Sequence, residues 1–331
     1  MISQRLPSLT PVATTPLKKN KLVALTGATG FIGSTLIKQL HQAGWHVNAL
    51  YRPRAGRLPV STQDLTWVAG ALHDSPSLAT LMAGADAVIH CAGAVRGTSR
   101  ADFDRINETG VHNVVQAAAA QTHPPRLLLV SSLAARMPDL SHYAASKWRG
   151  EEVLKASTLR WSIFRPPAVY GPGDRELLPL FKSMAKGIAP LPAGADGRFS
   201  MLHVDDLAAA MVHCLSQEGG DGLTFELDDG RAGGYDWPSV LSIAQQVLRN
   251  GGKIRRLPIP ITSLKLAAWT NFYAAKLLRY APMLTPGKIR EITHRDWLCD
   301  NNDITRITGW QPTCELAQGL AGLFDKNHKP R

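Results

Sequence analysis

The stretch that most constrains the fold is residues 22–33, LVALTGATGFIG, in which an apolar run ends in three glycines spaced three apart. Leu36, Ile37 and Leu40 follow with helical spacing. The pattern predicts a buried strand, a tight turn and a helix with an open N-terminus. Glycine lets the backbone approach a pyrophosphate closely, and the N–H groups of the helix favour its negative charge. The stretch therefore predicts a dinucleotide site, and a purely structural turn is the alternative.

The composition is typical of a folded protein with one large domain or two unequal ones: 331 residues, 44% hydrophobic and 19% charged. The four cysteines lack paired metal-ligand spacing, so we expect reduced thiols in a cytoplasm and no metal site. A net charge of +11 is compatible with nucleic acid, an anionic membrane surface, or an anionic cofactor and substrate. The sequence has no helix-turn-helix, zinc-finger or basic-aromatic RNA-binding signature, so we expect no nucleic-acid partner.

The first 20 residues are rich in Ser, Thr and Pro and contain no continuous apolar segment. They predict a flexible tail rather than a secretory signal. No later stretch reaches the ~18 uninterrupted apolar residues of a membrane-spanning helix.

From residue 21 the pattern alternates between strand and helix. We expect strands at 45–51, 65–68, 85–91 and 126–131, and helices at 77–82 and 107–121. Strands separated by helix-length segments predict a parallel sheet covered on both faces. Such sheets bind ligands at the carboxyl ends of their strands, so the informative residues should follow each strand.

Two segments that follow strands indicate a cofactor. Arg52 comes directly after the second strand, with Arg54 and Arg57 close behind. An acidic residue here would bind the ribose 2′-hydroxyl of NAD, whereas arginine suits the 2′-phosphate of NADP. We therefore expect NADP(H) to be favoured over NAD(H); a solvated loop arginine is the alternative. Residues 91–94 (CAGA) supply small side chains where the chain must pass close to the cofactor.

A candidate catalytic set follows the strand at 126–131. Tyr143 stands eleven residues after Ser132, and Lys147 four residues after Tyr143. Positions four apart share a helix face, so we expect the ammonium of Lys147 to lower the pKa of the Tyr143 phenol from its usual value of about 10. Ser132 would hydrogen-bond the same substrate oxygen that Tyr143 protonates. The alternative is an ordinary helix face.

In combination these motifs resemble the extended short-chain dehydrogenase/reductase superfamily, which includes NAD-dependent epimerases and dehydratases. The resemblance spans about 21 to 323 and rests on residues 26–33 (TGATGFIG), 91–93 (CAG), 131–132 (SS), 143–147 (YAASK), 165–173 (RPPAVYGPG) and 203–207 (HVDDL). It implies a doubly wound Rossmann fold, a nicotinamide cofactor, a smaller C-terminal substrate-binding domain, and a Ser132–Tyr143–Lys147 catalytic set. By motif position the cofactor would contact Gly27, Thr29, Gly30, Phe31, Ile32, Gly33, Arg52, Leu72, Cys91, Ala92, Gly93, Asn107, Tyr143, Lys147, Pro166 and Val169.

The sequence departs from the family pattern at two places. Ala71 stands where many relatives have an aspartate that touches the adenine, so only backbone contact from Leu72 remains there. The segment between Ser132 and Tyr143 is shorter than in typical sugar-nucleotide epimerases, which favours ketone reductases. The chain looks more like the atypical branch with steroid- and flavonol-type reductases and the complex I accessory subunit.

We place the cofactor domain at 21–170 and the substrate domain mainly at 171–325, with segments around 200–228 returning to the first. A helix should begin near His203, with Asp205 or Asp206 as its N-cap, and a strand at 222–227 and a helix at 237–248 should follow.

Residues 261–284 interleave apolar and aromatic side chains with basic ones. This pattern suits contact with an anionic membrane through 261–295, and a lid over the substrate pocket is the alternative.

The sequence thus predicts an NADP(H)-dependent reductase of a hydrophobic ketone, such as a steroid-like or 3-oxo-ceramide compound. The alternatives are a sugar-nucleotide epimerase or dehydratase, and a non-catalytic NADPH-binding scaffold. We expect a small-molecule substrate, a cytoplasmic location that includes the inner face of a membrane, and a homodimer as a further option.

Overall fold

The computed structural model describes residues 21–53, 60–194, 196–217, 219–278 and 280–324. Arg54 and Arg57, and the predicted tail at 1–20, lie outside the described residues.

A seven-stranded sheet forms the centre of the molecule, in the order β11-β6-β5-β4-β1-β2-β3. Every neighbouring pair in it is parallel. Read from β3, the order 3-2-1-4-5-6 is that of the doubly wound dinucleotide-binding fold, with β11 added at the far edge. The predicted fold class is therefore confirmed. The strands are β1 (Leu22–Thr26), β2 (His46–Tyr51), β3 (Leu65–Ala69), β4 (Ala87–His90), β5 (Arg126–Val130), β6 (Trp161–Arg165) and β11 (Leu223–Glu226).

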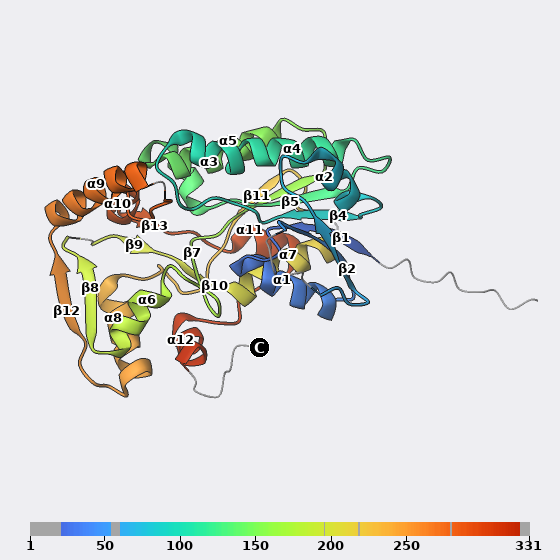
Figure 1. Ribbon diagram of the computed structural model, residues 1–331. Coiled ribbons are helices and arrows are strands. Elements are labelled where there is room, and N and C mark those ends of the chain that lie inside the picture. Colours follow the sequence, from blue (N-terminus) through green and yellow to red (C-terminus); the bar gives the residue numbers. More distant parts are fainter. Residues whose placement is uncertain (1–20, 54–59, 195, 218, 279, 325–331) are drawn as a thin grey trace, which may run out of the picture.

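Helices cover both faces of this sheet (Figure 1). Successive strand residues point to opposite faces, so Val23 and Leu25 of β1 belong to one core cluster and Ala24 to another. One face carries α1 (Phe31–Gln42), α7 (Val204–Ser216) and α11 (Asn302–Thr308). The other carries α2 (Ser75–Met82), α3 (Arg100–Asn107), α4 (Thr109–Ala119) and α5 (His142–Lys155).

The helix expected at 107–121 is found as α4, which begins after Glu108 and ends at Ala119. The sequence did not predict α3, and the N-cap predicted for α7 is wrong. The N-cap of α7 is His203, whose ring accepts a hydrogen bond from the Asp205 amide at 3.4 Å. Asp206 is instead buried and accepts hydrogen bonds from the chain at 313–314.

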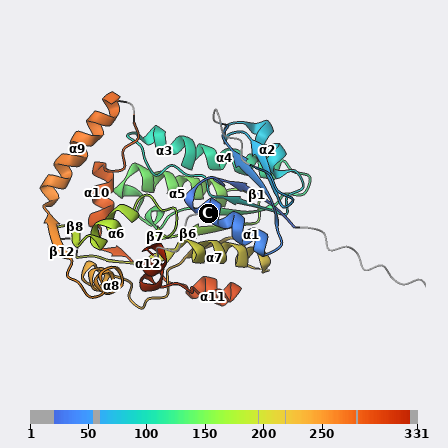
Figure 2. The same ribbon diagram turned by 60° about the horizontal axis from the view of Figure 1, so that its bottom comes forward.

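The rest of the chain gathers beyond the carboxyl ends of the strands (Figures 1 and 2). It has its own apolar core, which includes the buried Tyr170, Phe181 and Tyr235. Short 3-10 turns η1 (Leu133–Arg136) and η2 (Pro138–Leu140) lead into α5. The remaining helices are α6 (Leu178–Ala185), α8 (Trp237–Arg249), α9 (Ile261–Leu278), α10 (Pro286–Thr293) and α12 (Leu316–Phe324). Three strand pairs complete it: β7 (Ala168–Tyr170) with β10 (Met201–His203), β8 (Ile188–Pro192) with β12 (Arg255–Ile259), and β9 (Arg198–Phe199) with β13 (Asp296–Trp297).

Candidate active site

The turn between β1 and α1 requires glycine at two positions. Gly27 has a φ of +72°, and a Cβ there would lie 2.6 Å from the backbone nitrogen of Ala92. A Cβ on Gly33 would lie 2.2 Å from the carbonyl oxygen of Gly27. Both distances are far shorter than a van der Waals contact and involve backbone atoms, so a larger residue would displace the turn.

The N-terminus of α1 opens into the same turn. Gly30 is the N-cap, and no side chain of the described residues caps the first turn of the helix. The turn also contains Thr29, Phe31 and Ile32, the last of which packs against the sheet core. Unpaired N–H groups and the positive end of the helix dipole favour an anion such as a pyrophosphate. The turn therefore fits a dinucleotide.

Direct contacts connect this turn to α5, the predicted catalytic helix. Cys91 and Ala92, which follow β4, lie against Gly27. Burial raises the pKa of the Cys91 thiol to about 12, so it remains protonated at neutral pH. A Cβ on the next residue, Gly93, would lie 3.2 Å from Nζ of Lys147. Small residues after β4 thus allow the glycine turn and α5 to approach one another.

Asn107, the last residue of α3, fixes the segment that follows β4. Its side chain accepts a hydrogen bond from the Ala94 amide at 2.8 Å and donates one to the Ala94 carbonyl at 2.9 Å. The same Nδ2 also donates to the Ser146 hydroxyl of α5 at 2.9 Å. Asn107 therefore positions the segment after β4 against the helix that carries Tyr143.

The two serines after β5 have different surroundings. Ser131 is buried, and its hydroxyl donates to Oε1 of Glu151 at 2.5 Å. Glu151 also accepts two hydrogen bonds from Arg165, at 2.6 and 2.9 Å. Ser132 instead lines a cavity, and its hydroxyl accepts a hydrogen bond from the Ala134 amide at 3.2 Å. Of the two, Ser132 is the one that can reach a ligand in this cavity.

Tyr143 and Lys147 lie one turn apart on α5, but their electrostatics differ from the prediction. Burial raises the pKa of Tyr143 to about 12; the Ser132 hydroxyl counteracts this in part, and the charge of Glu291 adds to it. Burial lowers the pKa of Lys147 to about 8, and its Nζ donates to the Val130 carbonyl at 2.9 Å. The expected net lowering of the Tyr143 pKa is therefore wrong for the chain by itself, because desolvation of the phenolate outweighs any stabilisation by the Lys147 ammonium.

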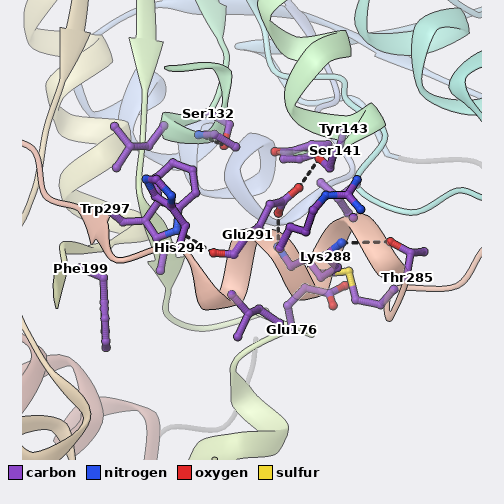
Figure 3. A pocket seen from close by; sticks show the side chains of 18 of the residues that line it. Ser132, Ser141, Tyr143, Glu176, Phe199, Thr285, Lys288, Glu291, His294 and Trp297 are labelled. Carbon is purple, nitrogen blue, oxygen red and sulfur yellow. Dashed lines mark hydrogen bonds and ion pairs between the residues drawn. The ribbon is translucent and has the colours of Figure 1, made fainter. Parts of the chain in front are cut away.

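Sequence reasoning missed a buried carboxylate beside this set. Glu291 of α10 is 5% exposed and accepts a hydrogen bond from the hydroxyl of Ser141, the N-cap of α5. It also pairs with Lys288 at 2.9 Å. In Figure 3 the Glu291 side chain projects from α10 toward Ser141, next to Tyr143. Glu291 is the one acidic residue in the basic stretch 253–295, and this was the signal available in the sequence.

A cavity of about 540 Å³ lies between the end of the sheet and the C-terminal helices. Ser132, Tyr143 and Glu291 all line it, and Glu291 reaches from α10 toward the start of α5 (Figure 3). Its volume is within the range of about 300–1,000 Å³ that is typical of small-molecule sites. Most of the remaining wall is apolar: Phe103, Leu177, Leu180, Phe181, Phe199, Met201, Trp237, Val240, Trp269, Phe272 and Met283.

The other predicted cofactor residues lie around the cavity and along the sheet edge. Pro166 lines the cavity, and its carbonyl accepts a hydrogen bond from the Leu133 amide at 2.9 Å. Val169 lies in β7 and packs against the sheet core.

Arg52 and Leu72 lie further along the sheet, one and two strands beyond the glycine turn, after β2 and β3. Arg52 is exposed at the carboxyl end of β2, in a groove that also includes Asp74. The Leu72 carbonyl accepts a hydrogen bond from the Asn113 side chain at 2.8 Å, which fixes the loop after β3. The structure therefore arranges the predicted residues along one edge of the sheet, from Arg52 to Tyr143.

Residues 23–227, which contain the whole seven-stranded sheet apart from Leu22, match the model of the NAD dependent epimerase/dehydratase family. The chain belongs to this family. Over 284 residues it is 38% identical to the ceramide reductase of Caulobacter vibrioides (strain NA1000 / CB15N), a match that covers 83% of this chain and 85% of that protein. The predicted resemblance is confirmed.

The chain is also similar, at lower identity, to other proteins and solved structures. The chain is 28% identical over 258 residues to NADH dehydrogenase (ubiquinone) 1 alpha subcomplex subunit 9, mitochondrial, of Arabidopsis thaliana, covering 76% of this chain and 63% of that protein. The structure of MoeE5 in complex with UDP-glucuronic acid and NAD superposes with a TM-score of 0.69 at 20% identity, over 91% of this chain and 97% of that chain. Membership of the epimerase/dehydratase family supports an NAD(P)-dependent enzyme of the oxidoreductase type. None of the helices in the described parts of the chain is long and apolar enough to span a bilayer.

Proposed function

We propose that the chain is an NADP(H)-dependent reductase that converts the ketone of a hydrophobic, lipid-like substrate, such as a 3-oxo-ceramide, to an alcohol. The observation that carries this proposal is the mainly apolar cavity of about 540 Å³, with the hydroxyls of Ser132 and Tyr143 on one wall. The volume suits part of an acyl chain, and the two hydroxyls can both donate a hydrogen bond to a carbonyl oxygen placed beside them. The similarity to a ceramide reductase supports the same substrate class.

The residues around the ketone would act through their hydrogen bonds and charges. Tyr143, with a pKa of about 12, carries its proton at neutral pH and donates it to the ketone oxygen. Ser132 donates a hydrogen bond to the same oxygen and orients it. Lys147 stabilises the phenolate that remains, which then regains a proton from solvent. A dinucleotide whose pyrophosphate is held at the glycine turn would supply the hydride from its nicotinamide.

The NADP(H) preference rests on Arg52. Its guanidinium is exposed at the end of β2, the position from which a side chain reaches the ribose of a dinucleotide bound at the turn after β1. A guanidinium binds a phosphate through paired, charge-assisted hydrogen bonds. Asp74 in the same groove accepts a hydrogen bond from the Ser77 amide at 3.4 Å, as the N-cap of α2.

Replacement of the proton donor tests the proposal. We expect Tyr143→Phe to lower NADPH oxidation with a 3-oxo lipid by a factor on the order of 10² or more, because the general acid is lost. NADPH affinity, measured by fluorescence titration, should change little. Tyr280→Phe is the matched control, since Tyr280 is 43% exposed and its hydroxyl bonds to Asn271 rather than facing the cavity. Unchanged turnover in Tyr143→Phe would refute the role of the phenol and favour a non-catalytic scaffold.

The family also contains epimerases and dehydratases, which keep their cofactor bound through the cycle. Purified protein that releases tightly held NAD⁺ on denaturation, and that does not oxidise NADPH with 3-oxo lipids, would favour a sugar-nucleotide activity instead.

A further inference from the structure

The outer face of α9 presents large apolar side chains to solvent. Leu266, Tyr273 and Leu277 are 70, 62 and 82% exposed, and their spacing of seven and four residues puts them on one side of the helix. The opposite side, at Ala268 and Ala275, is buried. In both views α9 stands at the edge of the molecule, next to α10 (Figures 1 and 2). Contiguous exposed apolar side chains of this kind mark a surface that binds a partner.

The surroundings of this face are strongly basic. The sequence from 253 to 290 contains eight lysines and arginines and no aspartate or glutamate. Lys265 and Lys276 are exposed on α9 itself, and Arg255 and Arg256 are exposed on β12, the strand that leads into it. We call these four basic residues, together with Leu257, Leu266, Trp269, Tyr273 and Leu277, the α9 surface.

The charge decides between two occupants of the α9 surface. In a two-fold dimer the same patch would face itself, so the lysines and arginines would meet their own copies without acidic partners. An anionic phospholipid bilayer offers the opposite charge, an apolar layer for the leucines, and an interface that tryptophan and tyrosine favour.

The α9 surface also borders the cavity. Trp269 is 48% exposed and at the same time lines the cavity, so it forms part of the cavity rim. Its ring stacks on Tyr273 on the outer side, with centroids 5.8 Å apart, and meets Phe272, another cavity residue, at 5.8 Å. A continuous row of aromatic rings therefore runs from the exposed face of α9 to the wall of the cavity.

We propose that the α9 surface docks on an anionic phospholipid bilayer and that a lipid substrate enters the cavity past Trp269 from that bilayer. The docking stands on the α9 surface alone, whereas the entry of substrate rests on the proposed function.

Sedimentation with vesicles tests the docking without any substrate. The full chain should pellet with vesicles of phosphatidylcholine and phosphatidylglycerol in equal parts at low salt, bind far less to phosphatidylcholine alone, and be released by salt. Lys265→Gln with Lys276→Gln should weaken binding roughly 25-fold, at about fivefold for each charge. Leu266→Gln with Leu277→Gln should weaken it by about tenfold or more, because apolar surface no longer enters the interface.

The matched control is Lys38→Gln with Val60→Gln, which removes one charge and one apolar residue that is 81% exposed, both at sites outside the α9 surface. Its binding should equal that of the parent. Reduction of a short, water-soluble ketone by the Leu266→Gln/Leu277→Gln variant should stay at the parent rate, which shows that the variant is folded.

Three results would overturn the docking: no pelleting with the anionic vesicles at low salt, equal binding to both vesicle types, or equal loss in the control variant. A dimer in sedimentation equilibrium that the Leu266→Gln/Leu277→Gln variant disperses would also overturn it, because the α9 surface would then be a subunit interface. If Tyr143→Phe retains turnover while vesicle binding follows the expectation, the proposed function fails and the docking stands.

Discussion

Ser131 and Ser132 are adjacent in sequence, and the structure predicts opposite consequences for their replacement by alanine. Ser131 donates a hydrogen bond of 2.5 Å to the fully buried Glu151, which keeps its two bonds to Arg165 when the hydroxyl is removed. The loss of one hydrogen bond to a charged group costs about 1.5–3 kcal/mol. A chain of this size unfolds with an entropy of about 0.6 kcal/mol per degree near its midpoint, so Ser131→Ala should lower the melting temperature by about 2–5 °C. Its turnover should remain close to that of the parent.

Ser132→Ala should show the reverse pattern. The hydroxyl accepts one hydrogen bond, from the Ala134 amide at 3.2 Å, so its loss should cost about 1 kcal/mol of stability or less. Because the same hydroxyl lines the cavity beside Tyr143, turnover should fall by a factor on the order of 10².

The two variants are compared by thermal unfolding and by NADPH oxidation with a 3-oxo lipid. The reasoning is refuted if Ser131→Ala loses turnover at unchanged stability, or if Ser132→Ala retains turnover.

Two further predictions concern the cofactor and the neighbouring carboxylate. Arg52→Ala should weaken NADPH binding by about 10- to 100-fold in fluorescence titrations and leave NADH binding unchanged, since the lost contact is to the 2′-phosphate; equal affinity of the parent for both cofactors would contradict this. Glu291→Gln should lower the pKa of Tyr143, because a negative charge that disfavours the phenolate is removed. In the alcohol-oxidising direction, where the phenolate accepts the proton, the rise of activity with pH should therefore move to lower pH. Glu176→Gln, in the wall of the same cavity, is the control. The same pH profile of alcohol oxidation in the parent, Glu291→Gln and Glu176→Gln would contradict the role of Glu291.

The glycine turn and the strands could be predicted from the sequence because their determinants are local. A Cβ at Gly27 or Gly33 would clash with backbone atoms at the end of the adjacent strand or within the turn, so the spacing of the glycines alone indicates the geometry. The strands of the main sheet are short apolar runs, and their predicted positions agree with the structure to within one or two residues at each end.

The features that could not be predicted depend on contacts between distant segments. The sequence did not predict α3, and the side chain of Asn107 at its end is held by Ala94 and by Ser146 of α5. The pKa of Tyr143 depends on its burial and on Glu291, which reaches the start of α5 from a position 150 residues beyond Ser141. Neither periodicity nor motif spacing carries such information.

The raised pKa of Tyr143 sets the protonation state in which the site would begin the proposed reduction. A phenol with a pKa of about 12 is protonated at pH 7, so in the chain by itself the form that donates a proton predominates. Lys147, with a pKa of about 8, is still mainly protonated at that pH and can stabilise the phenolate once the proton has left. Burial thus raises the pKa of Tyr143 and lowers that of Lys147. The result is a protonated phenol that can act as the acid, beside a cation that can stabilise the phenolate formed. The chain by itself therefore holds Tyr143 in the protonation state that the proposed reduction requires.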